Sequence, residues 1–167
     1  MISVLIVEDE ATAAEALIEY VGRVSGFEVV GNARTGADAL HRMAADGVDL
    51  LLLDIYLPDM SGLELLRMLR GAGNTVDAIA VTVANDQSAV KASVALGVVQ
   101  YVVKPFTFNT VRRRLKRYQE YHTLLTEHEL ILAQQEIDHL LNTLRDADRV
   151  AFREVSARSR CAHWSQP

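Results

Sequence analysis

Short runs of apolar residues recur along this chain, and segments with helical spacing separate them. The runs cover residues 2–7, 27–30, 50–53, 78–83 and 101–103. A short and almost uninterrupted apolar run is typical of a strand that is buried on both faces of a sheet. The alternation therefore predicts an α/β protein whose parallel strands are joined by helical crossovers.

The segments between these runs carry helix signals. Residues 11–24 place Ala14, Leu17, Ile18 and Val21 on one face. The other helices are predicted from residues that cap or end helices: starts at Thr35, Ser61, Asp86 and near Thr107, and ends at Gly71, Gly73 and Gly97. Right-handed crossovers place helices on both faces of the sheet. We expect a doubly wound, flavodoxin-like (βα)5 fold of strand order 2-1-3-4-5, with a C-terminal helical extension.

The bulk composition bounds the class of protein. The 167 residues suffice for one domain with a core and an appendage. Only 6% of them are aromatic, which suits an aliphatic α/β protein better than a β-sandwich. The net charge of −5 gives no global reason to expect binding to nucleic acid. The single cysteine, Cys161, fits a reducing compartment. Because no signal peptide and no membrane-spanning stretch are expected, the chain is predicted to be cytoplasmic, with no membrane partner.

Carboxylates follow two of the predicted strands. Glu8 and Asp9 come directly after residues 2–7, and Asp54 comes directly after residues 50–53. In the order 2-1-3-4-5 the first and third strands are neighbours, so the acids are expected at one edge of the sheet. Nearby carboxylates repel one another unless a cation compensates them, and Mg²⁺ prefers oxygen ligands. For Asp9, an ordinary helix cap is the alternative explanation.

Two further polar residues are expected at the same edge. Thr82 ends the fourth predicted strand, and Lys104 ends the fifth, directly before Pro105. Taken singly, each has an ordinary explanation, as a strand-forming threonine or as a solvated lysine. Together with the acids, a hydroxyl group, an ammonium group and a bound cation make a phosphoryl-transfer site.

Four segments of the chain resemble the receiver domain of response regulators from bacterial two-component systems. They are Val7-Glu8-Asp9-Glu10, residues 53–62, Val81-Thr82 and residues 101–106. The resemblance covers about residues 1–120. Within this family the chain is similar to the subgroup of transcriptional regulators that senses citrate and C4-dicarboxylates. Residues 135–141 resemble the linker that precedes the DNA-binding helix-turn-helix of that subgroup.

The resemblance implies the chemistry of the acidic residues. It implies that Asp54 is the phosphoacceptor and that a sensor histidine kinase is the phosphodonor. It also implies a bound Mg²⁺, whose ligands are Glu8, Asp9, Asp54 and the backbone carbonyl of Tyr56. Such a protein promotes its own phosphorylation and dephosphorylation but is not a metabolic enzyme.

The resemblance also implies a switch. Lys104 is expected to pair with the phosphoryl group, and a cis bond before Pro105 is expected to aim it. Thr82 is expected to form a hydrogen bond with the phosphoryl group, and Tyr101 to turn inward in response. Val83 stands where the family usually has a small residue, and we expect it to narrow access to the phosphoryl group and to slow its hydrolysis.

Two other functions use similar residues. Phosphohydrolases of the haloacid dehalogenase type also form an aspartyl phosphate at a strand end, but they need a second aspartate two residues after the nucleophile. Tyr56 occupies that position here, which argues against this class. The other alternative is a degenerate receiver that binds partners without phosphorylation, and the complete set of site residues argues against it.

The C-terminal part of the chain is predicted to lie outside the receiver domain. We expect a receiver at residues 1–120, a helical linker at 121–148 and an irregular segment at 149–167. Seam-like 4-3-4-3 spacing begins before the linker, at Val111, Leu115, Tyr118, His122 and Leu125, and is repeated within it from Leu130 to Leu144. Two interpretations stay open: the helix forms a homodimer, or it packs its apolar stripe on its own domain or on a missing one.

Contact with DNA is expected only through an output domain that is not evident in this chain. The basic run at residues 112–117 is more typical of a solvated helix face than of a DNA-reading surface. The segment after Asp148 is too short for a helix-turn-helix domain and shows no apolar periodicity.

Overall fold

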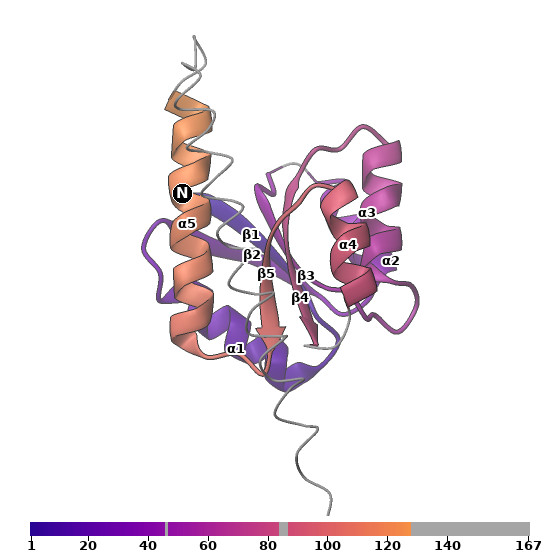
Figure 1. The fold of residues 1–167 in the computed structure, drawn as a ribbon, viewed down its shortest axis with the longest axis horizontal. Coiled ribbons are helices and arrows are strands. Elements are labelled where there is room, and N and C mark those ends of the chain that lie inside the picture. The colour runs from indigo at the N-terminus through magenta and orange to yellow at the C-terminus, as the bar shows by residue number, and fades with distance from the viewer. Residues whose placement is uncertain (46, 84–86, 128–167) are drawn as a thin grey trace, which may run out of the picture.

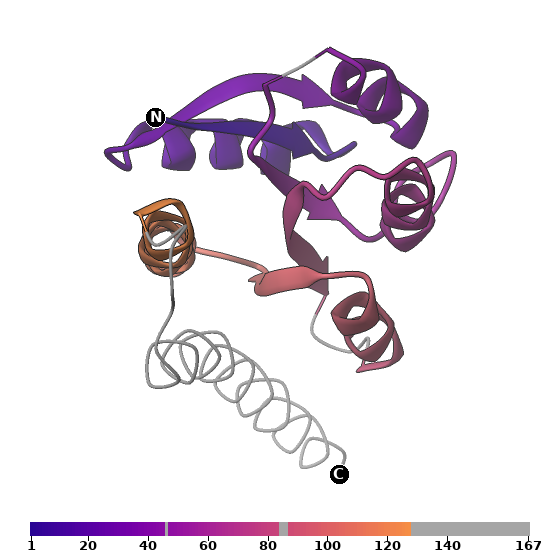
Figure 2. The same cartoon turned by 90° about the horizontal axis from the view of Figure 1, so that it is seen from above.

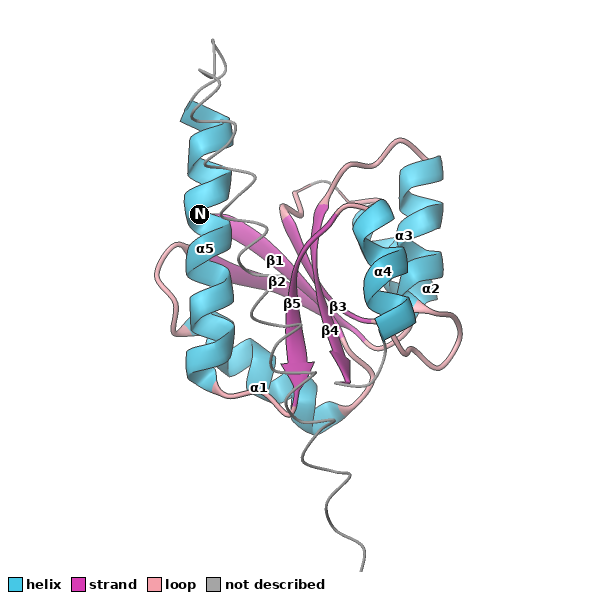
Figure 3. Cartoon of the chain, in the orientation of Figure 1, coloured by secondary structure: helices cyan, strands magenta, loops and turns pink. Residues whose placement is uncertain are grey.

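Five parallel strands form one sheet, and helices alternate with them along the chain (Figure 1, Figure 3). The computed structural model describes residues 1–45, 47–83 and 87–127. The strands are β1 (Ile2–Val7), β2 (Phe27–Ala33), β3 (Leu50–Asp54), β4 (Asp77–Val83) and β5 (Val98–Lys104). The helices are α1 (Ala11–Gly22), α2 (Gly36–Met43), α3 (Gly62–Gly71), α4 (Gln87–Ala95) and α5 (Phe108–Glu127). The strand order is β2-β1-β3-β4-β5, which confirms the predicted fold class.

Two strands, β2 and β5, are at least three residues longer than the sequence predicted. β2 continues to Ala33 although it contains Gly31 and Asn32, which are poor strand formers. Both residues pair with β1, so pairing along the sheet overrides their local preference. β5 begins at Val98 rather than at Tyr101, because its first residues already pair with β4.

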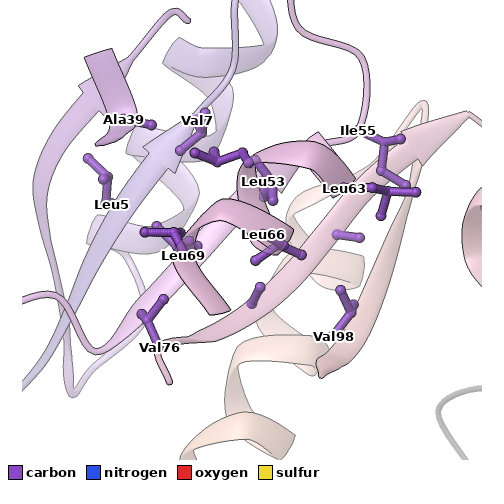
Figure 4. Packing of buried hydrophobic residues seen from close by; sticks show 14 of the residues in the cluster. Leu5, Val7, Ala39, Leu53, Ile55, Leu63, Leu66, Leu69, Val76 and Val98 are labelled. Atoms are coloured by element: carbon purple, nitrogen blue, oxygen red, sulfur yellow. The ribbon is translucent and has the colours of Figure 1, made fainter. Parts of the chain in front are cut away.

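The helices cover the two faces of the sheet unequally. Seen from above, α1 and α5 lie on one face, and α2, α3 and α4 lie on the other (Figure 2). The leucines of β3 contribute to the hydrophobic clusters on both faces of the sheet, because successive residues of a strand point to opposite faces. Leu51 and Leu53 belong to the cluster under α3, which Figure 4 shows. Leu50 and Leu52 belong to the cluster under α1 and α5.

Two predicted helix caps are confirmed. The Thr35 hydroxyl accepts a hydrogen bond from the backbone N–H of Asp38 at the start of α2. The Ser61 hydroxyl accepts hydrogen bonds from Leu63 and Glu64 at the start of α3. A side-chain oxygen in this position satisfies an N–H group that the helix leaves unpaired. The third predicted cap, Asp86, lies outside the described residues.

The first half of α5 packs on its own domain. Val111, Leu115 and Tyr118 are buried in the cluster under α1 and α5, so these seam positions are not free to contact a second chain. Farther along, Leu125 is 42% exposed. Of the two interpretations of this helix, packing on its own domain therefore holds for its first half. The second stretch of seam spacing, from Leu130, lies outside the described residues.

The basic run does not form a single solvated face. Arg112 and Arg113 are exposed, whereas Arg114 is buried in the domain. Lys116 donates hydrogen bonds to the Ser25 carbonyl and to the Gln119 side chain. Across the described ranges, none of the helices has both the length and the apolar character needed to cross a bilayer.

Candidate functional site

Three carboxylates meet at the carboxyl ends of β1 and β3, as the sequence predicted. The two strands are neighbours, with Val7 paired to Leu53, so the residues that follow them emerge side by side. Glu8, Asp9 and Asp54 each offer an oxygen, and these oxygens lie within 4.8 Å of one another. Glu8 and Asp54 are buried, whereas Asp9 is exposed. The cluster therefore has a buried floor and one solvent-facing ligand.

Lys104 reaches this cluster from the end of β5. Its ammonium nitrogen lies 2.7 Å from Glu8 Oε2 and 2.8 Å from Asp54 Oδ2. The peptide bond between Lys104 and Pro105 is cis. Burial alone would lower the pKa of Lys104, but its hydrogen bonds to Asp54 and Glu8 outweigh burial and raise that pKa above its ordinary value. Lys104 is therefore fully charged at neutral pH.

Glu8 is the most strongly desolvated acid of the three. Burial raises its pKa, and the neighbouring charge of Asp54 adds to the increase, while Lys104 opposes it. A negative charge close to a buried carboxyl group disfavours the charged form of that group. One lysine against three acids leaves a formal excess of two negative charges. A divalent cation would cancel this excess.

The donor set fits a hard cation. Every candidate ligand in the cluster is a carboxylate oxygen, and these oxygens are close enough to share one ion. Such ligands suit Mg²⁺, which binds a few carboxylates and keeps several waters. The exposed position of Asp9 leaves a side of the cluster open to water. The cluster is typical of the Mg²⁺ sites that the sequence led us to expect.

The backbone around Asp54 is held tightly. Its Oδ1 accepts a hydrogen bond of 2.9 Å from the backbone N–H of Tyr56. The N–H of Gly62, at the start of α3, donates to the Ile55 carbonyl at 2.7 Å. A β-carbon on Gly62 would collide with the backbone carbonyl oxygen of Asp54. The acid thus sits where a strand, a tight loop and a helix start converge.

Thr82 and Tyr101 belong to the strands β4 and β5 and are not members of the acidic cluster. Thr82 is buried near the end of β4, which lies between β3 and β5. Tyr101 is buried under α4, where its hydroxyl lies 2.6 Å from Ser93 Oγ and donates to the Val90 carbonyl at 3.1 Å. Ser93 was not predicted as a site residue, because a serine within a helix is common and its partner Tyr101 lies in another element.

The haloacid dehalogenase alternative finds no support in the geometry. The position of its second aspartate is Tyr56, whose side chain is 52% exposed and carries no carboxyl group. The residue that contacts Asp54 from across the site is a lysine instead.

Comparison with known proteins agrees with the family resemblance that the sequence motifs indicated. Residues 4–116 match the model of a family described as the response regulator receiver domain. The chain is 35% identical over 147 residues to the transcriptional regulatory protein MalR of Bacillus subtilis, covering 88% of this chain and 62% of MalR. It is 36% identical over 141 residues to the probable C4-dicarboxylate response regulator DctR of Halalkalibacterium halodurans, covering 84% and 61%. The predicted likeness to the C4-dicarboxylate subgroup is thus confirmed.

A solved structure agrees with these relatives. The crystal structure of the receiver domain of the TMAO respiratory system response regulator TorR matches with a TM-score of 0.64 and 34% identity, over 72% of this chain and 98% of that one. The chain spans about three fifths of the length of its curated relatives. Receiver domains are not enzymes in the ordinary sense, as the sequence predicted. Residues 4–116 place the chain in the response regulator receiver domain family.

Proposed function

We propose that the chain is a phosphorylation-controlled switch in which Asp54 accepts a phosphoryl group from a sensor histidine kinase. The observation that carries this proposal is the convergence of Glu8, Asp9 and Asp54 within 4.8 Å, with Lys104 in contact with two of them. A cation site, an acceptor carboxylate and an ammonium group are the parts that phosphoryl transfer needs.

In the proposed reaction a carboxylate oxygen of Asp54 attacks the phosphorus of a phosphohistidine. A P–O bond to Asp54 forms, the P–N bond of the donor breaks, and the histidine nitrogen leaves with the bond's electron pair. The Tyr56 N–H, which already donates to Oδ1 of Asp54, keeps the carboxylate oriented during the attack. Hydrolysis later breaks the P–O bond and returns Asp54 and inorganic phosphate.

Glu8, Asp9, Asp54 and the backbone carbonyl of Tyr56 are the proposed Mg²⁺ ligands. When bound, Mg²⁺ neutralises the charge that develops on the phosphoryl oxygens. Lys104 would give up part of its pairing with Glu8 and Asp54 and turn to the phosphoryl group.

In the proposed switch, Thr82 and Tyr101 transmit the phosphorylation state of Asp54 to α4. Thr82 lies one strand away from Asp54, and within the described residues its hydroxyl makes one long contact of 3.5 Å, to the carbonyl of Val83. It is therefore free to turn to a phosphoryl group at little cost. Tyr101 already joins β5 to α4 through Ser93 and Val90, so its position is coupled to that helix.

The proposed output is control of transcription by the parent protein. This rests on the relatives MalR and DctR, which are a transcriptional regulatory protein and a probable C4-dicarboxylate response regulator. In the parent protein, DNA would be bound by an output domain and not by the receiver. The function is tested by incubating the full chain with acetyl phosphate and Mg²⁺ and measuring its intact mass. A gain of one phosphoryl group that chelation of Mg²⁺ prevents is expected, whereas no gain would favour the degenerate receiver.

Val83 gives a prediction about the lifetime of the phosphorylated state. Its side chain is 47% exposed at the end of β4, directly after Thr82. Because its apolar surface hinders water, Val83→Ala should release phosphate about threefold faster, a change of about 0.6 kcal/mol in the barrier. Phosphate release after removal of the phosphodonor measures the rate. Val94→Ala, which alters an exposed valine on α4, is the control and should change nothing. An equal rate in Val83→Ala and wild type would refute the idea.

A further inference from the structure

The loop between β3 and α3, residues 55–61, is fastened at its tip to another helix. Asp59 Oδ1 accepts a hydrogen bond of 2.8 Å from the backbone N–H of Gly36, and Oδ2 accepts one of 2.9 Å from Ala37. These are the first residues of α2. A side chain more than 20 residues away thus satisfies N–H groups that a helix start leaves unpaired.

The contact is favourable to a charged carboxylate. The N–H groups of Gly36 and Ala37 hold the pKa of Asp59 below its usual range. The aligned peptide dipoles of α2 also favour a negative charge at its first turn. Met60 packs beside this clamp, because a β-carbon on Gly36 would collide with the Met60 side chain. The loop tip is therefore held by a charged and a hydrophobic contact together.

The loop is closed at its neck as well. Tyr56 and Ser61 form an isolated antiparallel bridge, and the N–H of Gly62 donates to the Ile55 carbonyl. With neck and tip both fixed, the backbone between Tyr56 and Asp59 has little freedom. The backbone carbonyl of Tyr56 belongs to this fixed stretch.

The other side of the clamp is tied to the acidic cluster. The N–H of Glu8 donates a hydrogen bond of 3.0 Å to the Ala33 carbonyl at the end of β2. Two residues later, Thr35 caps α2 through the N–H of Asp38. A chain of contacts therefore runs from Glu8 through the start of α2 to Asp59 and back along the loop toward Asp54. Asp59 closes this ring.

We propose that Asp59 is a positioning residue for the cation site, holding the Tyr56 carbonyl in place by clamping its loop to α2. This inference rests on the proposed Mg²⁺-dependent phosphorylation of Asp54. A purely structural role, in which Asp59 only caps α2, is the competing explanation. Thr35 allows the two to be separated, because its hydroxyl caps the same helix through the N–H of Asp38 and not through the loop.

The test compares Asp59→Ala with Thr35→Ala in the full chain. Mg²⁺ affinity is measured by titration calorimetry, phosphorylation by acetyl phosphate is followed by intact mass, and melting temperature reports the helix cap. Both variants should melt below wild type. Only Asp59→Ala should weaken Mg²⁺ binding, by about tenfold, the lower end of the effect of outer-shell groups around a metal. Its phosphorylation rate should recover in part at saturating Mg²⁺.

Asp59→Asn controls for the lost negative charge, because asparagine keeps one acceptor oxygen for α2. If position matters, its Mg²⁺ affinity lies between those of wild type and Asp59→Ala. If Asp59→Asn and Asp59→Ala are equally weak, charge alone explains the effect and the inference is overturned. Equal Mg²⁺ affinity in Asp59→Ala and Thr35→Ala overturns it too. Failure of wild type to bind Mg²⁺ would instead remove the proposed function, and the inference with it.

Discussion

Replacing Lys104 with methionine should separate cation binding from phosphoryl transfer. The ammonium group pairs with Glu8 and Asp54 at 2.7 and 2.8 Å, and its side chain is only 21% exposed. Without it, two buried carboxylates lose their countercharge, which should cost about 2 kcal/mol of stability in the absence of Mg²⁺. Mg²⁺ should bind more tightly than in wild type and restore most of this loss. Phosphorylation by acetyl phosphate should nevertheless slow about 100-fold, because a charge that stabilises the transferring group is gone.

The stability loss in Lys104→Met should depend on pH in a definite direction. Lys104 now holds the pKa of Glu8 down, so its removal raises that pKa further above the ordinary 4.5. A folded-state pKa above the unfolded one favours folding at low pH, and the benefit fades as pH rises. The loss should therefore be small near pH 4.5 and larger at neutral pH. Thermal unfolding without Mg²⁺ measures it.

Lys91→Met is the matched control for this prediction. Lys91 is exposed on α4, and removing its charge should leave stability within about 0.5 kcal/mol of wild type. Weaker Mg²⁺ binding in Lys104→Met, or an unchanged rate of phosphorylation, would contradict the role given to Lys104.

Gly62→Ala should damage both the fold and the site. The added methyl group would meet the backbone carbonyl of Asp54, and it would lie 3.1 Å from the Cα of Ile55. Because these are backbone atoms, the end of β3 must shift, which we expect to cost about 3 kcal/mol. The shift displaces Asp54, so phosphorylation should fall far more than the loss of folded protein explains. Urea unfolding and intact mass after treatment with acetyl phosphate measure the two effects.

Gly71→Ala is the control from the same helix. A β-carbon there would meet nothing within 4 Å, so alanine should be neutral or stabilise by up to about 1 kcal/mol. Phosphorylation of Gly71→Ala should match wild type. If Gly62→Ala is as stable and is phosphorylated as fast as Gly71→Ala, the close approach of α3 to Asp54 is not needed for stability or for phosphorylation.

The sequence predicted the site best where charged residues directly follow a buried strand. Apolar runs such as residues 50–53 can only be satisfied inside a sheet, so the acids after them had to emerge at its edge. That reasoning placed Glu8, Asp9 and Asp54 together, and the structure agrees. The contact of Lys104 with Glu8 and Asp54 follows from the same logic, because β5 ends at the same edge.

Contacts between loops and helices that are distant in the sequence could not be predicted from local sequence patterns. Asp59 follows Pro58 in what reads as an ordinary turn, and nothing near it indicates a partner on α2. The same holds for Ser93 and Tyr101, which meet only because α4 packs over β5. The spacing of Val111, Leu115 and Tyr118 was equally compatible with a dimer seam and with a helix packed on its own sheet. Tertiary packing, not periodicity, decides between these outcomes.

The phosphorylation of Asp54 is tested most directly by the intact mass of the full chain after incubation with acetyl phosphate and Mg²⁺. Wild type should gain one phosphoryl group, and Asp54→Ala should gain none under the same conditions. Circular dichroism of Asp54→Ala confirms that it is folded. A phosphoryl group gained equally by Asp54→Ala, or no gain by wild type at any Mg²⁺ concentration, would contradict the proposed role of Asp54.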